Sequence, residues 1–267
     1  MDRKIPLSIS VFFPVYNDAL SIGKLVNDVK GVLGRRFDDW EILLVNDGSA
    51  DGSGQVVDEL AASDPRIRAI HHDRNRGFGH VVRTGFAHCT GDLIFYTDGD
   101  GQFDPKELDV LLDHMDNADI VNGFKIRRND HVVRRIEGRL YHAVTRMFFG
   151  VNLKDVDCDF RLFKRHVVED IMPLQCSGGV IGAEILAKVH ERGYRVVQVP
   201  VHHYPRPHGR SQFFCPRHLG WAILELFIMC FKRVVSNRDL AGPGRGRRIT
   251  ATHGSPDPPG RGTLAGR

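Results

Sequence analysis

Hydrophobic and polar positions in the first 125 residues alternate between two patterns. Short apolar runs of the kind seen in buried strands are separated by segments whose apolar residues recur at helical spacing. The predicted strands are Leu7–Phe13, Trp40–Val45, Ile67–His71, Asp92–Thr97 and Asp119–Gly123. The predicted helices are Ile22–Leu33, Ala50–Ala62, Phe78–His88 and Pro105–Met115. This alternation predicts an α/β fold in which helices cover both faces of a mostly parallel, Rossmann-like sheet.

The second half of the chain has a less regular pattern. It predicts helices at His131–Phe149, Val180–Arg192 and Pro216–Val235, a loop that runs from Asp155 into a strand ending at Arg165, a strand at Tyr194–His203 and a loop at Tyr204–Phe213. From Ser236 onward Gly, Pro and Arg dominate and no periodicity remains, which is typical of a disordered segment. We therefore expect one domain over 1–215, divided near residue 125, then an amphipathic helix over 216–235 and a basic tail over 236–267.

Composition and charge exclude several classes of protein. Hydrophobic residues make up 42% and charged residues 26%, as in ordinary soluble domains. The net charge of +4 equals the six Arg minus the two Asp of the tail 236–267, so no basic field for nucleic acid is expected on the domain. The five Cys form no CxxC pair and no zinc-binding spacing, which favours free thiols in the cytoplasm. Neither a signal peptide nor a membrane-spanning run is evident.

The segment with the strongest chemical signal is Asp98-Gly-Asp-Gly-Gln102, which directly follows a predicted strand. Two carboxylates and an amide oxygen are suitable ligands for Mg²⁺ or Mn²⁺, and the glycines allow the backbone to approach a diphosphate. A divalent ion there would neutralise the charge that develops on a leaving group. The alternative is an ordinary solvated turn. The position after a strand favours the metal site, because ligands bind at the carboxyl ends of the strands in such sheets.

Two further segments occupy equivalent positions. Val45-Asn-Asp-Gly-Ser49 ends the second strand, where Asp47 is a candidate acceptor for a base or ribose, and Ser49 or Asp51 is a candidate cap for the next helix. Asn75–Gly79 is rich in Gly before a helix but lacks a full phosphate-binding motif.

Basic residues gather in two places. Lys and Arg are frequent over 125–139, and Arg206, His208 and Arg210 form a second group. The guanidinium group binds phosphate in a bidentate manner, although a run of charges is also typical of a solvated helix face. The apolar segment Pro216–Val235 has flanking basic residues, so it fits either the membrane interface or packing on the domain.

The order of these segments along one chain resembles family 2 glycosyltransferases of the GT-A fold. Within that family the chain is most similar to polyprenyl-phosphate sugar synthases of the dolichol-phosphate mannose synthase type, over roughly residues 5–235. The resemblance rests on Phe13-Pro-Val-Tyr-Asn-Asp18, Val45-Asn-Asp-Gly-Ser49, Asn75-Arg-Gly-Phe-Gly79, Thr97-Asp-Gly-Asp-Gly-Gln-Phe-Asp104, Asp157-Cys-Asp-Phe-Arg-Leu-Phe163 and His203–Phe213.

The resemblance implies a role for each group of site residues. The nucleotide-sugar would be bound by Pro14, Tyr16, Asp18, Val45, Asp47, Asp98, Gly99, Asp100 and Gln102. The metal, Mg²⁺ or Mn²⁺, would be held by Asp98, Asp100 and Gln102. The acceptor phosphate would be bound by Arg127, Arg134, Arg206, Arg210, Ser211 and Gln212. The catalytic candidates are Asp100, Asp157, Asp159 and Arg127.

The chain departs from the family pattern at three points. Gln212 replaces a Lys that ends the family's Arg-x-x-Gly-x-Ser-Lys motif, and Asp159 stands where many relatives carry Gly. Many relatives also carry C-terminal transmembrane helices, and no such helix is expected in this sequence. The first departure puts one phosphate contact in doubt, and the second leaves the role of Asp159 open.

The resemblance implies an inverting transfer of a sugar from a GDP-mannose or UDP-hexose type donor to a polyprenyl phosphate at the inner face of a membrane. A phosphate acceptor is already ionised near neutral pH, since its second pKa is about 6, and so requires no strong general base. Two alternatives remain open. One is a transferase for a saccharide or other soluble acceptor, with Asp157 or Asp159 as base, and the other is an inactive nucleotide-binding or scaffold protein. The choice of GDP or UDP and the oligomeric state also remain open.

Overall fold

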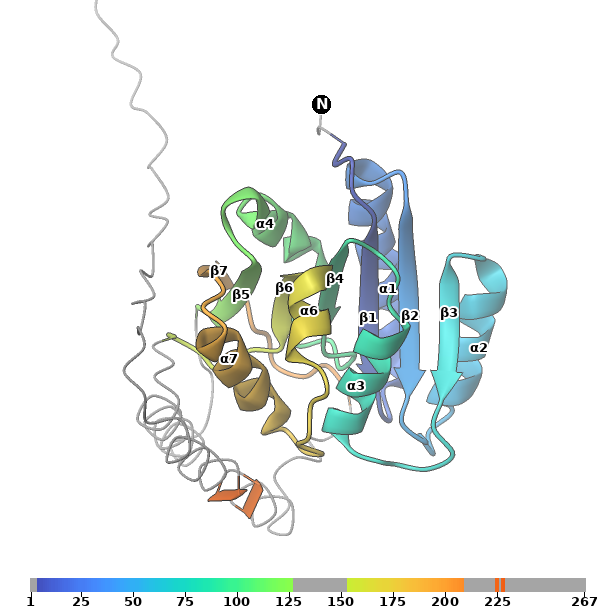
Figure 1. Cartoon of the computed structure of the whole chain (residues 1–267). Coiled ribbons are helices and arrows are strands. Elements are labelled where there is room, and N and C mark those ends of the chain that lie inside the picture. The colour runs from blue at the N-terminus through green and yellow to red at the C-terminus, as the bar shows by residue number, and fades with distance from the viewer. Residues whose placement is uncertain (1–3, 127–152, 209–223, 226, 229–267) are drawn as a thin grey trace, which may run out of the picture.

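The protein is described by a computed structural model that places residues 4–126, 153–208, 224–225 and 227–228. These residues form a seven-stranded sheet in the order β3-β2-β1-β4-β6-β5-β7 (Figure 1). The strands are β1 (Ile9–Val15), β2 (Trp40–Asn46), β3 (Ile67–His71), β4 (Leu93–Thr97), β5 (Ile120–Lys125), β6 (Phe160–Lys164) and β7 (Val196–Val201). Neighbouring strands are parallel except at β6, which runs antiparallel to β4 and to β5.

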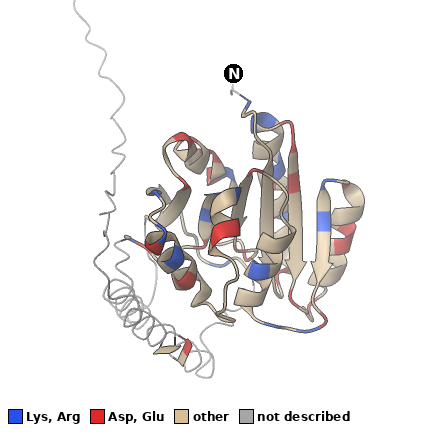
Figure 2. Ribbon diagram, viewed as in Figure 1, with Lys and Arg blue, Asp and Glu red and all other residues tan. Residues whose placement is uncertain are grey.

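Helices cover both faces of this sheet. They are α1 (Ala19–Arg36), α2 (Ser53–Ser63), α3 (Phe78–His88), α4 (Leu108–Leu112), α6 (Arg165–Ile171) and α7 (Ile181–Glu191), with the short 3₁₀ helices η1 (Pro105–Glu107) and η2 (Met115–Asn117). Most Lys, Arg, Asp and Glu lie on the helices and loops, and the central strands are largely free of them (Figure 2). The fold is therefore the mostly parallel α/β arrangement that the hydrophobic pattern predicts.

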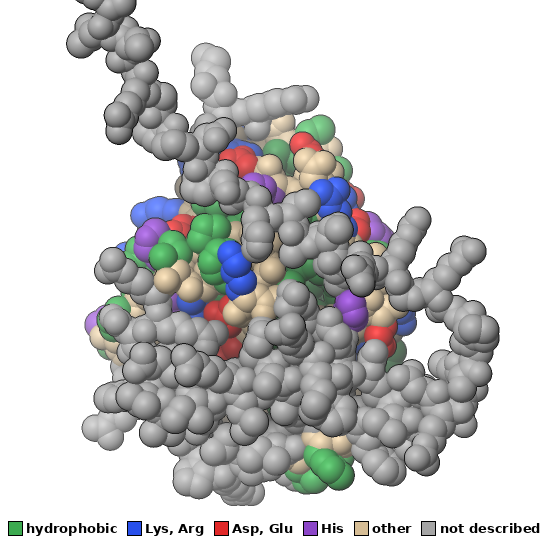
Figure 3. All heavy atoms as spheres, turned by 90° about the vertical axis from the view of Figure 1, so that its left-hand side faces the viewer, with side chains coloured by type: hydrophobic (Ala, Val, Ile, Leu, Met, Phe, Trp, Pro, Cys, Tyr) green, Lys and Arg blue, Asp and Glu red, His purple; other side chains and the backbone are tan. Residues whose placement is uncertain are grey.

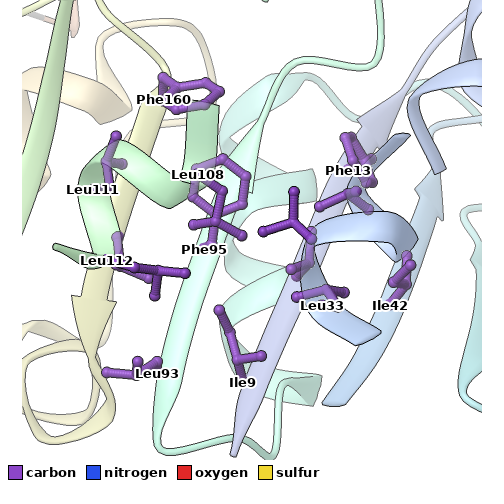
Figure 4. Packing of buried hydrophobic residues seen from close by; sticks show 14 of the residues in the cluster. Ile9, Phe13, Leu33, Ile42, Leu93, Phe95, Leu108, Leu111, Leu112 and Phe160 are labelled. Carbon is purple, nitrogen blue, oxygen red and sulfur yellow. The ribbon is translucent and has the colours of Figure 1, made fainter. Parts of the chain in front are cut away.

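The alternation of side chains along β1 divides the core into two layers. Ile9 and Phe13 point to one face and pack with Leu33 of α1 and with α4, as Figure 4 shows. Phe12 points to the opposite face and packs with Phe86 of α3. Successive strand residues point to opposite faces, so a strand that is apolar throughout requires a helix layer on each side.

The structure differs from the sequence prediction at three places. The predicted helix Pro105–Met115 is divided into η1, α4 and η2, and Asp104 caps the first of these by accepting a hydrogen bond from the backbone nitrogen of Lys106. The short helix α6 was not predicted, because its seven residues offer too few turns for a periodic signal. The predicted helices His131–Phe149 and, for the most part, Pro216–Val235 lie outside the described residues, as does the basic tail.

Two other sequence expectations concern the thiols and the membrane. Cys89, Cys158 and Cys176 are buried free cysteines, and the remaining two cysteines lie outside the described residues. Among the residues that the structure places, no helix combines the length and the apolar character needed to cross a bilayer.

Candidate active site

The loops that follow β1 and β2 are joined by hydrogen bonds. The backbone nitrogen of Asn17 donates to Oγ of Ser49 (3.0 Å), and Oδ1 of Asn17 accepts from the backbone nitrogen of Ala50 (2.9 Å). The backbone nitrogen of Asp18 donates to Oγ of Ser53 (2.9 Å). Asn17 adopts a φ of 56°, a left-handed conformation that Asn tolerates better than most residues. The turn after β1 therefore has a fixed shape before any ligand binds.

The loop that follows β4 carries the predicted metal ligands. A Cβ atom at Gly99 would lie 2.6 Å from the carbonyl oxygen of Pro14, so only glycine lets this loop pass so close to the end of β1. Asp100 is buried, and its Oδ1 accepts from the backbone nitrogen of Gln102 (2.9 Å). The structure thus brings Asp98, Asp100 and Asp18 to the same edge of the sheet.

The electrostatics of this edge fit a divalent cation. Burial raises the pKa of Asp18 to about 6, and the charge of Asp100 adds to the effect. Burial, followed by the charges of Asp159 and Asp100, raises the pKa of Asp98 well above its usual value. Carboxylates that destabilise one another in this way are stabilised by a cation placed among them. The donor set of hard oxygens suits Mg²⁺ or Mn²⁺.

The acidic edge formed by Asp18, Asp98 and Asp100 supplies only part of the ligands that a cation needs. Among the residues that the structure places, no three His, Cys, Asp or Glu side chains lie close enough together to enclose an ion. Mg²⁺ is commonly held by one or two carboxylates together with the phosphates of a substrate. Asp98 and Asp100 therefore fit a cation that is shared with a bound diphosphate. Gln102, the third predicted ligand, donates from Nε2 to the carbonyl oxygen of Tyr204 (3.1 Å).

The segment after β7 brings a predicted acceptor residue to the same place. Nη2 of Arg206 lies 2.7 Å from Oδ2 of Asp100, and Nη1 lies 3.6 Å from Oδ1 of Asp18. The backbone nitrogen of Tyr204 donates to the carbonyl oxygen of Gln102 (2.8 Å), which holds this segment against the loop after β4. Residues about one hundred positions apart in the sequence thus bring a group of carboxylates together with a guanidinium group.

Asp47 is buried at the end of β2 and organises the Gly-rich loop. Its Oδ1 accepts from the backbone nitrogen of Arg76 (3.0 Å), and its Oδ2 accepts from that of Gly77 (2.9 Å). Oδ1 also lies 2.6 Å from Nδ1 of His72, whose Nε2 lies 3.0 Å from Oγ1 of Thr84. Sequence reasoning missed His72, because a lone histidine after a strand carries no pattern. Direct contact of Asp47 with a base stays a prediction.

The loop before β6 supplies a second group of carboxylates. Asp155 is buried, and its Oδ1 accepts from the backbone nitrogen of Asp157 (3.1 Å). Nζ of Lys125 donates to the carbonyl oxygen of Asp157 (2.8 Å). Burial lowers the pKa of Lys125, but the charges of Asp157 and Asp155 raise it more, so the net shift is upward and the ammonium stays charged. Asp155 was also missed, although its Asp-x-Asp spacing with Asp157 is a recognisable turn signal.

The remaining predicted residues fall into two groups. Pro14 pairs with Val45 in the register of β1 and β2, and the backbone nitrogen of Tyr16 donates to Oδ2 of Asp18 (3.2 Å), so these residues lie at the same edge. The acceptor candidates that lie outside the described residues are Arg127, Arg134, Arg210, Ser211 and Gln212.

A short described part of the C-terminal segment contacts the loop before α7. Oε1 of Glu225 accepts from the backbone nitrogen of Ser177 (2.7 Å) and from its Oγ (2.5 Å). The carbonyl oxygen of Ser177 in turn accepts from the backbone nitrogen of Gly79 (2.8 Å). Leu224 and Phe227 are exposed beside this anchor. Hydrophobic side chains are visible at the lower edge of the molecule in Figure 3, where Figure 1 places this segment.

The class of protein follows from the fold, the acidic edge and comparison with known proteins. Residues 10–172 match the model of glycosyl transferase family 2, and the chain belongs to that family. It is 33% identical over 208 residues to undecaprenyl-phosphate 4-deoxy-4-formamido-L-arabinose transferase of Enterobacter sp. (strain 638). The aligned region covers 77% of this chain and 62% of the relative. The chain thus spans about three fifths of the length of that relative.

Solved structures establish the fold as GT-A. Glucosyl-3-phosphoglycerate synthase from Mycobacterium tuberculosis in complex with UDP superimposes with a TM-score of 0.65 at 16% identity, over 86% of this chain and 88% of the other. The complex of that enzyme with Mn²⁺, UDP and glucosyl-3-phosphoglycerate gives a TM-score of 0.64 at 17% identity, over 85% and 80% of the two chains. At such identity the likeness concerns the fold alone.

Proposed function

We propose that this chain transfers a sugar from a nucleoside diphosphate donor to a polyprenyl phosphate. The observation that carries the proposal is the contact of Arg206 with Asp100. A guanidinium group, which is able to bind phosphate, lies here beside carboxylates suited to a diphosphate-bound cation. The two charged partners of the reaction, the donor diphosphate and the acceptor phosphate, would therefore meet at one edge of the sheet.

Asp98 and Asp100 would hold Mg²⁺ or Mn²⁺ together with the donor diphosphate. The bound ion supplies charge neutralisation for the departing nucleoside diphosphate. The chain's own contribution is positioning, because Gly99 and the hydrogen bonds around Asn17 fix the loops before the donor arrives. Solved GT-A structures with UDP and Mn²⁺ or Mg²⁺ support such a use of metal in this fold.

Arg206 and Lys125 would offset the charge of the acceptor phosphate. A phosphate oxygen attacks the anomeric carbon from the face opposite the leaving diphosphate, which inverts the configuration. The phosphate is largely ionised near neutral pH, since its second pKa is about 6, so no general base is needed. The relative from Enterobacter, whose name describes an undecaprenyl-phosphate acceptor, supports this choice.

The test is a screen with the purified full chain and Mn²⁺. UDP-glucose and GDP-mannose are each offered with a short polyprenyl phosphate, with 3-phosphoglycerate or with a free sugar. We expect labelled sugar in the lipid phase for one of the two donors, and no lipid product when EDTA removes the metal. Transfer to a soluble acceptor but not to the lipid would contradict the proposed acceptor, and absence of any nucleotide binding would favour the scaffold alternative.

The same proposal places the chain as a peripheral protein at the inner face of a membrane. Phe227 and Ile228 are exposed in the described part of the C-terminal segment, and the arrowheads of β2 and β3 point to the same lower edge in Figure 1. An exposed apolar segment at the end of the molecule that carries the active site would bring that site close to a lipid-borne phosphate.

We expect the chain to co-sediment with anionic liposomes and expect deletion of residues 216–267 to release it. The physical reason is loss of the apolar segment together with the basic tail. A matched control replaces Leu20, an exposed apolar residue on α1, with Gln and should leave sedimentation unchanged. Retention of binding after the deletion would contradict the assignment.

A further inference from the structure

The pairing of β4 and β6 places Asp159 beside the loop that follows β4, which carries Asp98 and Asp100. These strands are antiparallel, and Thr97 lies opposite Phe160 at the end of the ladder. Asp98 directly follows Thr97 and Asp159 directly precedes Phe160, so the two residues are neighbours just beyond the last pair of the ladder. In agreement, the charge of Asp159 is, after burial, the largest contributor that raises the pKa of Asp98.

One oxygen of Asp159 is fixed by the protein. The hydroxyl of Tyr96 donates to Oδ1 of Asp159 (3.1 Å), and Nη2 of Arg161 lies 3.7 Å from the same oxygen. Nη1 of Arg161 donates to the Tyr96 hydroxyl (3.0 Å), so this hydroxyl accepts one hydrogen bond and donates another. Tyr96 and Arg161 thus act on Asp159 as a connected pair.

The guanidinium of Arg161 is itself held in place. The side chain is fully buried, and its Nε donates to Oδ1 of Asn122 (2.9 Å) and to the carbonyl oxygen of Cys158 (3.0 Å). Nη2 donates to the carbonyl oxygen of Val156 (2.7 Å). Because these acceptors belong to β5 and to the loop before β6, Arg161 has little freedom to move, and the carboxylate that it supports is preorganised.

The second carboxylate oxygen of Asp159, Oδ2, is available to accept a hydrogen bond from a ligand. Within residues 4–126 and 153–208, no hydrogen bond is made to its Oδ2, and the side chain is 19% exposed. A carboxylate at this position repels phosphate but can accept a hydrogen bond from an uncharged donor. A sugar on a diphosphate that shares a cation with Asp98 and Asp100 would present hydroxyl groups of this kind.

We propose that Oδ2 of Asp159 accepts a hydrogen bond from a hydroxyl of the transferred sugar, and that Tyr96 and Arg161 are positioning residues for this contact. The inference rests on the proposed function and adds to it a residue that selects the donor sugar. It predicts that loss of the carboxylate weakens recognition of the sugar and leaves recognition of the nucleotide unchanged.

The test compares sugar-bearing and sugar-free nucleotides in the full chain. Binding of UDP, UDP-glucose, GDP and GDP-mannose is measured by calorimetry with Mn²⁺, and kcat and KM are measured for the donor that is turned over. For Asp159→Asn we expect kcat/KM for the donor to fall about 10- to 100-fold, as for a lost hydrogen bond to a charged group. Affinity for the matching sugar-free nucleotide should change by less than about twofold, because the proposed hydrogen bond is made to the sugar and not to the nucleotide.

Tyr96→Phe gives a second variant that keeps the carboxylate and removes only its support. We expect the donor KM to rise about 3- to 10-fold with a smaller change in kcat, as for a single neutral hydrogen bond. The surface offers a matched control, because the hydroxyl of Tyr194 donates to Oδ2 of Asp170 (2.9 Å), far from the acidic edge. Tyr194→Phe and Asp170→Asn should leave all the kinetic constants unchanged.

The outcomes separate this inference from the proposed function. If the unaltered chain binds neither donor, both are overturned. If it turns over a donor and Asp159→Asn does so equally well, only the role of Asp159 is overturned. Equal weakening of UDP and UDP-glucose, or of GDP and GDP-mannose, would also overturn it, because the residue would then serve the nucleotide or the fold.

Discussion

Replacement of Asp100 with alanine should abolish metal-dependent sugar transfer and leave the fold intact. The carboxylate of Asp100 lies beside Asp18 and Asp98, where a cation would be shared with the donor diphosphate. Loss of this ligand removes charge stabilisation of the leaving group, and we expect turnover to fall at least about 100-fold. Turnover and the affinity for Mn²⁺ with a nucleoside diphosphate measure the effect.

Stability should behave differently from activity in this variant. The charge of Asp100 raises the pKa of Asp18 and of Asp98, so its removal relieves repulsion between carboxylates. Because the change also removes the ion partner of Arg206, the two effects oppose each other, and we expect only a small change in the melting temperature. Asp113→Ala serves as the control, because Asp113 is largely exposed and makes a surface ion pair with Arg36. Near-normal turnover of the Asp100 variant would refute the metal assignment.

Replacement of Arg161 with methionine should lower the free energy of unfolding by about 3–5 kcal/mol, as when one partner of a buried ion pair is removed. The change leaves Asp159 without its buried partner and removes the donors to Asn122 and Tyr96. Methionine fills a similar volume, so the loss reflects unsatisfied polar groups more than a cavity. Urea denaturation of the full chain measures it.

Arg192→Met is the matched control for this experiment. Arg192 pairs with Asp170 near the protein surface, where an ion pair contributes about 0–1 kcal/mol. We expect its free energy of unfolding to stay within about that range of the unaltered chain. An equal decrease in the free energy of unfolding in both variants would show that the buried hydrogen bonds of Arg161 stabilise the fold no more than a surface ion pair does.

The proposed acceptor and the role of Asp159 can be tested independently of these experiments. A phosphate acceptor needs no general base, whereas a sugar hydroxyl does. If Asp159 were that base, Asp159→Asn would lower kcat for transfer to a soluble acceptor and spare donor binding. A change in the recognition of the donor sugar itself would instead support the hydrogen bond proposed here.

Local patterns in the sequence predicted most of the regular elements. The strand Ile67–His71 and the helix Phe78–His88 have the predicted bounds, because a single run of apolar residues and nearby Gly residues defined each of them. The proposed metal-binding segment Asp98–Gln102 was also recognisable, since all of its chemical groups lie within five consecutive residues. Helix α6 and the division of Pro105–Met115 were not predicted, because segments of three to seven residues carry little periodicity.

The sequence by itself determined the class of fold and the candidate donor-binding edge, because short-range periodicity and neighbouring residues specify both. Only the tertiary structure decided which distant groups meet there. The antiparallel course of β6 places Asp159 beside Asp98, and the return of the chain after β7 places Arg206 against Asp100. The tertiary structure also shows that buried Asp47 holds the Gly-rich loop Asn75–Gly79, because its two carboxylate oxygens accept hydrogen bonds from the backbone nitrogens of Arg76 and Gly77. Such contacts depend on strand order and direction, which long-range packing selects and no local pattern encodes.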